Sequence, residues 1–383
     1  MNPHLLTVPH ATSIIERMVG EDMHAKRVAS LTNAVVGVVN AVSLSIHAIG
    51  AGLAAAAGLN TKHAIKQVDR LLSNSALRVW TLFADWVPSV LAARKAIVVA
   101  LDWTEFDADG HATIALYLVT SHGRATPLVW MTVKKARLKG RRNAFEDAVI
   151  LRLHEVLPLG VKVTLLADRG FGDQKLYQFL TELGFDFIIR FRGVVAVESV
   201  DGDVRTAGQW VSPNGRVRHL RGARVTQDRY ALDSVVCVKA RGMKEPWCLA
   251  VRGVAITGAA AVTLYGRRFT IEETFRDTKD PRYGLGLSAT HVRDVNRRDR
   301  LLLICAMAMT LLTLLGAAGE SLGMDRMLKA NTVKKRTHSL FRQGCEYYAA
   351  LLNMKRERLD PLVQRFGEYI LREPVYVNAL GLK

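Results

Sequence analysis

Four polar residues whose side chains could act together lie in one short segment, YGRRFTIEETFRDTK (265–279). They are Tyr265, Arg268, Glu272 and Lys279. If the segment is one helix, turning by about 100° per residue, the four side chains fall within an arc of roughly 60°. One helix face would then present a phenol, a guanidinium, a carboxylate and an ammonium group. A carboxylate flanked by two cations suits a site that handles both metal ions and phosphates.

Two aspartates upstream each stand at the end of an apolar, strand-like run. Asp102 follows VVAL, and Asp168 follows TLLA. Sites in α/β sheets lie beyond strand ends, so the two carboxylates would be side by side if their strands are neighbours. Glu272 would reach them from a helix packed over the sheet. Each acid taken alone could instead be a structural cap or a solvated ion-pair partner.

The three acids together indicate one kind of chemistry. Hard oxygen donors of this type suit Mg²⁺ or Mn²⁺ rather than zinc. Two such ions, about 3.5–4 Å apart, can clamp the attacking and the leaving oxygens of a phosphodiester exchange. We therefore predict a metal-dependent enzyme acting on nucleic acid, in which Asp102, Asp168 and Glu272 are both the metal ligands and the catalytic residues.

The order of the elements predicts how these acids are positioned. Three apolar runs with short connections favour an antiparallel meander of strands, followed by helix, strand, helix and strand. Residues from 193 to about 262 are rich in valine, glycine and turn signals, which predicts a β-rich insertion before the Glu272 helix. The expected fold class is α/β, a mixed sheet flanked by helices. The expected bounds are 96–106, 112–123 and 127–133 for the meander, 143–157 and about 174–184 for the helices, and 161–168 and 185–192 for the later strands.

The two ends of the chain are expected to be helical. Apolar residues recur at helical spacing through 1–92, so we expect a helical DNA-binding domain there, a catalytic domain over 93–320 and a helical C-terminal region over 321–383, a candidate for dimerisation. The run Leu301–Gly319 has no charge and by length alone could span a bilayer. We favour a helix buried in a large α/β core, because such helices are apolar all round.

Composition restricts the class of protein further. The 383 residues carry a formal net charge of +18, and 49% of them are hydrophobic. A folded, strongly basic chain points to a polyanionic partner such as DNA, RNA or an anionic membrane surface, although a generic basic protein has the same balance. No secretory signal is apparent, so we expect a cytoplasmic protein. Buried free thiols are expected rather than a zinc site, because no CxxC pair occurs among Cys237, Cys248, Cys305 and Cys345.

Clusters of basic residues mark where a nucleic acid could bind. One helical face of segment 60–77 is typical of a small DNA-binding unit, although a solvated amphipathic helix shows the same pattern; it carries Lys62, His63, Lys66 and Arg70. Arg190 and Arg192 close a strand, and the clusters at 297–300 and 334–336 are expected to add nonspecific affinity. Residues 134–142, hereafter the basic loop, are expected to contact phosphates through Lys134, Lys135, Arg137, Lys139, Arg141 and Arg142, with a solvated loop as the alternative.

The chain resembles the DDE transposases of bacterial insertion sequences, and among them the insertion-sequence-4 family. That family has the signature Y-x2-R-x3-E-x6-K, which is matched in type and spacing by Tyr265, Arg268, Glu272 and Lys279. The first acid stands in a DxT-like context, Asp102-Trp103-Thr104, and the second in a D-R-G-F context, 168–171. The resemblance extends from about residue 60 to 320 and includes the β insertion.

This resemblance implies an RNase H-like catalytic core and cut-and-paste movement of a DNA element. The three acids would bind two Mg²⁺ or Mn²⁺ ions, and the freed 3′-hydroxyl would attack the other strand to form a hairpin and later join target DNA. Tyr265, Arg268 and Lys279 would contact phosphates near the cut. Some relatives stack a flipped base on a tryptophan of the insertion, for which we favour Trp247 over Trp210.

The implied partners are double-stranded DNA, both the element's terminal inverted repeats and the target, and a second copy of the chain in the DNA complex. The implied location is the bacterial nucleoid. Two alternatives stay open from the sequence. One is a metal-dependent nuclease that cuts without joining strands, and the other is a catalytically silent DNA-binding product of an element.

Overall fold

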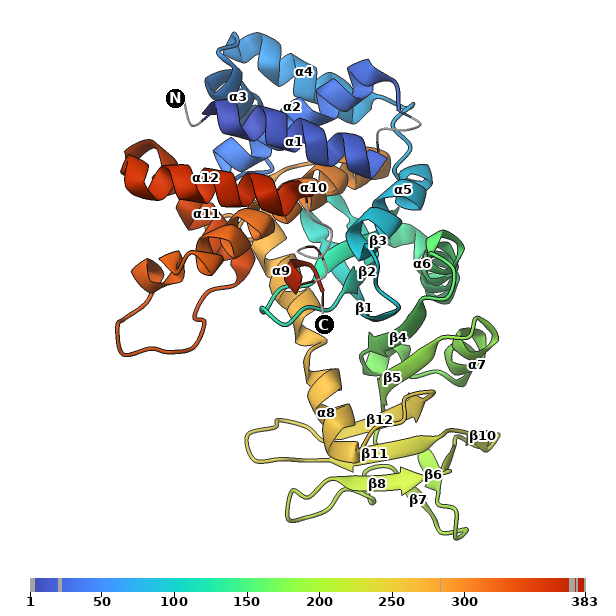
Figure 1. Ribbon diagram of the computed structural model, residues 1–383. Helices are drawn as coiled ribbons and strands as arrows, with labels where there is room; N and C mark the ends of the chain where they lie inside the picture. The colour runs from blue at the N-terminus through green and yellow to red at the C-terminus, as the bar shows by residue number, and fades with distance from the viewer. Residues whose placement is uncertain (1–3, 20–22, 283, 372–375, 377, 382–383) are drawn as a thin grey trace.

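The computed structural model describes residues 4–19, 23–282, 284–371, 376 and 378–381. They form a mixed α/β structure in which one large sheet is flanked by helices (Figure 1). The expected fold class is therefore confirmed. The chain begins with five helices, α1 (His4–Val19), α2 (Ala25–Ala41), α3 (Ile46–Ala57), α4 (Thr61–Ser73) and α5 (Val79–Leu91).

The centre of the sheet places the two aspartate-bearing strands next to each other. The first three strands form the expected antiparallel meander, β1 pairs in parallel with β4, and β4 pairs in parallel with β5. The strand order is β3-β2-β1-β4-β5. Sequence and structure agree closely on these elements, which are β1 (Ala96–Phe106), β2 (His111–Leu118), β3 (Thr126–Lys134), α6 (Arg142–Val156), β4 (Lys162–Ala167), α7 (Gln174–Glu182) and β5 (Asp186–Phe191).

The β-rich insertion enlarges this sheet instead of forming a wholly separate layer. Three of its strands continue the sheet beyond β5 in the order β12-β11-β8, all antiparallel, so the complete sheet has eight strands. The remaining four form a small sheet in the order β10-β9-β6-β7. The strands are β6 (Ala196–Glu198), β7 (Val204–Thr206), β8 (Arg218–Arg221), β9 (Arg224–Val225), β10 (Tyr230–Ala231), β11 (Ser234–Val238) and β12 (Trp247–Arg252).

The single helix expected over 265–279 is wrong. The segment consists of the end of α8 (Gly258–Gly266) and all of α9 (Phe269–Lys279), separated by a tight turn. In that turn the N–H groups of Arg267 and Arg268 bond to carbonyls three residues back instead of four, which rotates the chain by more than 100° per residue. Gly266 at the junction disfavours a continuous α-helix. Tyr265 therefore lies on α8, while Glu272 and Lys279 lie on α9.

The long apolar segment near residue 300 is a helix buried inside the protein. α10 (Val295–Ser321) runs between the sheet and the N-terminal helices (Figure 1), and most of its side chains are buried. Among the described residues, α10 is the one helix that is long and apolar enough to cross a membrane. The α2–α3 pair is long and apolar enough only if both helices are counted together, and they are bent by 96° at the break between them. The expected core helix is confirmed. Two further helices follow it, α11 (Leu340–Ala350) and α12 (Arg356–Leu371).

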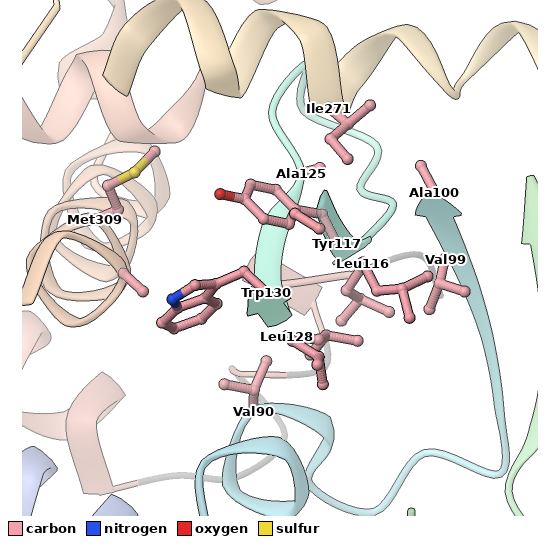
Figure 2. Packing of buried hydrophobic residues seen from close by; sticks show 14 of the residues in the cluster. Val90, Val99, Ala100, Leu116, Tyr117, Ala125, Leu128, Trp130, Ile271 and Met309 are labelled. Atoms are coloured by element: carbon pink, nitrogen blue, oxygen red, sulfur yellow. The ribbon is translucent and has the colours of Figure 1, made fainter. Parts of the chain in front are cut away.

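Large side chains from several elements fill the core beside the meander. Trp130 of β3 meets Phe83 of α5 edge-on, with ring centroids 4.8 Å apart. Tyr117 of β2 meets Phe275 of α9 in the same way at 5.3 Å, which holds α9 over the sheet. Figure 2 shows buried side chains of α5, α9 and α10 gathered around β1, β2 and β3. This packing fixes the helix that carries Glu272 relative to the strand that carries Asp102.

The basic cluster at 297–300 does not form a free DNA-binding surface, contrary to expectation. Arg298 is fully buried and pairs with Asp109 in the turn after β1. Arg300 donates hydrogen bonds to the carbonyls of Leu72 (2.8 Å) and Leu77 (2.9 Å). Two of the three arginines thus anchor the start of α10 to β1 and to the end of α4. Burial explains the error, because a sequence cluster cannot reveal which cations satisfy internal acceptors.

Close crossing of α10 and α11 gives a stability prediction. A methyl group at Gly344 would lie 1.8 Å from the Leu312 carbonyl oxygen, so Gly344→Ala must push the helices apart. We expect the free energy of unfolding to fall by about 1–3 kcal/mol, measured by urea denaturation. Gly193→Ala is the control, because its nearest neighbouring atom would be an ordinary 3.7 Å away. Equal stability of the two variants would contradict the helix crossing.

Candidate active site

Asp102 lies on β1 with its side chain directed toward the start of α9. Its Oδ1 accepts a hydrogen bond from the backbone N–H of Trp103 (2.8 Å), and its Oδ2 accepts one from Arg268 (3.0 Å). Burial raises the pKa of Asp102 to about 6, the Arg268 guanidinium opposes this rise, and the carboxylates of Asp168 and Glu272 add to it. The other two predicted acids are therefore near enough to act on Asp102 electrostatically.

Asp168 follows β4 directly, at the same edge of the sheet. Leu101 of β1 is in register with Ala167 of β4, so Asp102 and Asp168 are the next residues on neighbouring strands, which lie about 4.8 Å apart. The Asp168 carboxylate also accepts a hydrogen bond from the backbone N–H of Gly170 (2.8 Å). This bond closes the short turn after β4 and orients the second acid.

Arg268 stands between the first and third acids. Its Nη1 donates to Asp102 and its Nη2 to Glu272, one turn later on α9. The Arg268 side chain is only 6% exposed, whereas that of Glu272 is 46% exposed. The Nε of Arg268 is buried and has no hydrogen-bond partner among the described residues. This arginine therefore bridges two acids and offsets one of their two negative charges, while its Nε stays unused.

The three acids have the donor chemistry that suits divalent cations, but Arg268 occupies the space between two of them. Carboxylate oxygens are the donors that Mg²⁺ and Mn²⁺ prefer, and a cationic group already lies between Asp102 and Glu272. Within the described ranges, no three His, Cys, Asp or Glu side chains are close enough together to hold a metal ion. The three acids therefore have the donor chemistry that divalent cations prefer, while Arg268 lies between two of their carboxylates.

Lys279 is held against the continuation of β1. Its Nζ donates to the carbonyl of Glu105 (2.7 Å) and to Oγ1 of Thr104 (3.3 Å), and it lies 5.2 Å from the centre of the Phe106 ring. Arg268, Glu272 and Lys279 all face β1 from one side of α9. An open cleft of about 570 Å³ runs along this junction and is lined by Asp102, Trp103, Thr104, Glu272, Phe275, Arg276, Lys279, Asp280, Pro281 and Ser288.

The signature tyrosine joins the acid site to the insertion. Tyr265 is almost fully buried and meets Trp247 of β12 edge-on at 4.9 Å. Phe269, which is 41% exposed, lies 6.1 Å from the same indole ring. Trp210, by contrast, is buried and donates its indole N–H to the Val197 carbonyl in the small sheet. Of the two tryptophans considered for base stacking, the structure brings Trp247 to the signature residues.

The expected strand-end arginines differ in their surroundings. Arg190 on β5 is 18% exposed and donates to the Glu245 carboxylate (2.8 Å), which also pairs with Arg169 after the second acid (2.7 Å). Arg192 lies just beyond β5 and is exposed. Glu245 therefore competes with any DNA phosphate for Arg190, a pairing that the sequence alone does not reveal.

The basic loop lies between β3 and α6. Lys134, Arg137, Lys139, Arg141 and Arg142 are exposed. The sixth cation is engaged elsewhere, since Lys135 pairs with Glu105 and Asp107, both at 2.6 Å.

The polar face of α4 borders a groove. Lys62, His63, Lys66 and Arg70 are all exposed on this helix. His63 and Arg70 line a groove of about 440 Å³ together with Ser30, Gln67, Leu71 and Asn74. Arginine, asparagine and glutamine are the side chains that read base edges in DNA grooves. Gln67 and Asn74 follow the same helical spacing as His63 and Arg70, but they are uncharged, so a pattern of basic residues does not include them.

A buried carboxylate next to the first acid was also missed. Glu146 of α6 accepts a hydrogen bond from the indole N–H of Trp103 (2.7 Å). Its ion pair with Arg142 has the i,i+4 spacing that a sequence can show. Its contact with Trp103 has no local signal, because the two residues are far apart in the chain.

Comparison with known proteins agrees with this geometry. The family model of the transposase DDE domain matches residues 94–311, which contain all three acids. No curated protein matches the chain. Members of the family generally use divalent metal ions, and the domain implies a DNA substrate. Because the match covers more than half of the 383 residues and spans the sheet, the acids and the cleft, the chain belongs to the transposase DDE-domain family.

Proposed function

We propose that this protein moves a DNA element by cut and paste, in the manner of the insertion-sequence-4 transposases. One observation supports the proposal most strongly: Arg268 joins Asp102 to Glu272, and Asp168 occupies the neighbouring strand end. The Y-x2-R-x3-E-x6-K spacing supports the choice of family. Its last member, Lys279, lines the same cleft as the first and third acids.

The proposed reaction divides the work between metal ions and side chains. Two bound Mg²⁺ or Mn²⁺ ions would activate the attacking water or 3′-hydroxyl and stabilise the leaving oxygen. Asp102, Asp168 and Glu272 would hold them. Arg268 would exchange its carboxylate partners for a DNA phosphate, which its planar, two-pronged donor set binds well. Lys279 would place a second positive charge on the same strand.

The remaining surfaces are assigned by charge and exposure. The α4 groove would read the terminal inverted repeats, and the basic loop with Arg192 would hold the backbone near the cut. Trp247 would accept a flipped base if the ends pass through a hairpin. Two copies of the chain would pair in the DNA complex, with the helices after α10 as the candidate contact, and the protein would act at the nucleoid in the cytoplasm.

A strand-transfer assay tests the proposal. The purified chain is incubated with Mg²⁺ and a duplex carrying the inverted repeat that flanks its gene, and separately with pre-cut ends and a target plasmid. A transposase nicks the first substrate and joins the second to the plasmid. Nicking without joining would assign the protein to the metal-dependent nucleases. Binding without either reaction would indicate a silent DNA-binding product.

Salt dependence of DNA binding tests the basic loop. Each phosphate contact contributes about −0.9 to the slope of log K against log salt concentration. Replacing Arg137, Lys139 and Arg141 with alanine is therefore expected to make the slope shallower by about 2–3, measured by fluorescence anisotropy. Lys162→Ala is the control, because Lys162 is exposed at the end of β4 opposite Asp168. An unchanged slope in the triple variant would exclude the loop from the DNA path.

A further inference from the structure

A buried carboxylate on α6 contacts the residue that follows the first acid. Successive residues of a strand point to opposite faces, so Trp103 lies on the face away from Arg268, toward α6. There its indole N–H donates to Oε1 of Glu146 at 2.7 Å. The Glu146 side chain is 9% exposed, and burial raises its pKa while the bonds from Trp103 and Arg142 oppose the rise. Burying a carboxylate costs free energy unless hydrogen bonds satisfy it. Trp103 and Arg142 supply those bonds to Glu146.

Trp103 also controls the orientation of Asp102. The backbone N–H of Trp103 donates to Oδ1 of Asp102 (2.8 Å), while Oδ2 faces Arg268. A change in the position of the Trp103 backbone therefore turns the carboxylate of the first acid. Glu146 fixes the indole ring of the same residue from the other side of the sheet. Two hydrogen bonds thus connect the α6 carboxylate to the acid through one tryptophan.

The same oxygen of Glu146 binds the end of the basic loop. Arg142, the last residue of the loop and the first of α6, donates its Nε to Oε1 of Glu146 at 3.2 Å. Its guanidinium also lies 5.0 Å from the centre of the Trp103 ring. Arg142 is exposed on its other side, so it can meet a phosphate without leaving the indole. Arg142, which is expected to contact a DNA phosphate, therefore also makes contacts within the protein.

We propose that Glu146 is a positioning residue that aligns Asp102 through Trp103 and connects it to the basic loop. The inference rests on the proposed role of Asp102 as a metal ligand. Glu146 itself does not act as a ligand, because its Oε1 already accepts from two donors and it lies on the opposite face of β1 from Arg268 and Glu272. DNA bound at Arg142 would thereby be sensed at the first acid, three hydrogen bonds away.

Four variants test this chain of contacts. Glu146→Ala removes the acceptor, Glu146→Gln keeps an acceptor oxygen, and Trp103→Phe keeps a ring but loses the donor. The fourth combines Trp103→Phe with Glu146→Ala. The control is Glu155→Ala, a substitution on the same helix at a carboxylate that is 48% exposed and pairs with Arg152 three residues earlier. For each we would measure kcat and KM for nicking, and Mn²⁺ affinity without DNA.

We expect Glu146→Ala and Trp103→Phe each to lower kcat by about ten- to a hundredfold, with little change in KM for DNA. Glu146→Gln should recover most of the rate. The combined variant should be no slower than either single one, because both remove the same bond. A kcat for Glu146→Ala equal to that of Glu155→Ala, or losses that multiply in the combined variant, would overturn the inference.

The affinity measurement separates this inference from the proposed function. If the wild-type chain does not nick DNA at all, the proposed function fails, and Mn²⁺ titration alone decides the role of Glu146. Binding about tenfold weaker in Glu146→Ala than in Glu155→Ala would support the positioning role. Equal affinities would overturn it.

Discussion

Asp102→Asn, Asp168→Asn and Glu272→Gln are each expected to abolish metal-dependent nicking of an element-end duplex. Metal ions supply several kcal/mol of transition-state stabilisation, so losing one ligand should slow the reaction by about a thousandfold or more. Binding of the duplex should persist, because phosphate contacts dominate affinity. The measurement is single-turnover cleavage on denaturing gels, together with anisotropy for binding.

Neighbouring acids provide matched controls for this prediction. Glu105→Gln, Asp173→Asn and Glu273→Gln remove one charge each, close to the three predicted acids in the sequence. Asp173 caps α7, and Glu273 pairs with Arg276 and Arg124 instead of Arg268. These variants should cut within about threefold of the wild-type rate, since surface changes cost little. Normal cleavage by Asp102→Asn, Asp168→Asn or Glu272→Gln would remove that residue from the site.

Arg268→Ala is expected to change metal binding and cleavage in opposite directions. Without the guanidinium, Asp102 and Glu272 lose their internal cation and become available, so Mn²⁺ affinity of the DNA-free protein should rise by about tenfold, a typical coupling between competing ligands. Cleavage should fall by about a hundredfold or more, because a donor aimed at transition-state charge is lost. Isothermal titration with Mn²⁺ and single-turnover cleavage measure the two effects.

Arg267→Ala provides the control for charge alone. Arg267 is the preceding residue and is exposed, whereas Arg268 is buried between the acids. Its loss should leave Mn²⁺ affinity nearly unchanged. If Arg268→Ala bound Mn²⁺ no better than Arg267→Ala, the guanidinium would not be competing with metal ions for the carboxylates.

The strands and the convergence of the acids could be predicted because their causes are local. Buried strands are short apolar runs, and the meander follows from short connections. Asp102 and Asp168 each come at the end of such a run, so parallel pairing of the two strands brings them together. Burial of the long apolar helix α10 can be predicted for the same reason, because a segment that is apolar all round must be covered on every side.

Other features depended on contacts between distant residues and could not be predicted. The break between α8 and α9 accompanies the packing of Tyr265 against Trp247 of the insertion. Arg298 and Lys135 look like surface cations in the sequence, but each has an acidic partner far along the chain. Glu146 has no local mark of its contact with Trp103. Tertiary packing decides which charged side chains form pairs, and a local sequence pattern does not carry that information.

Hydrogen bonding between β5 and β12 ties the insertion to the strand next to the one that leads to Asp168. Leu249 pairs with Arg190 and Cys248 with Phe191 in this ladder, so the indole that begins β12 keeps a set distance from the strand ends near Asp168. A chimera that exchanges this insertion between homologues must therefore preserve the alignment of that ladder. A slip of one residue would turn every side chain of the grafted strand to the opposite face, and the tryptophan would no longer reach its tyrosine.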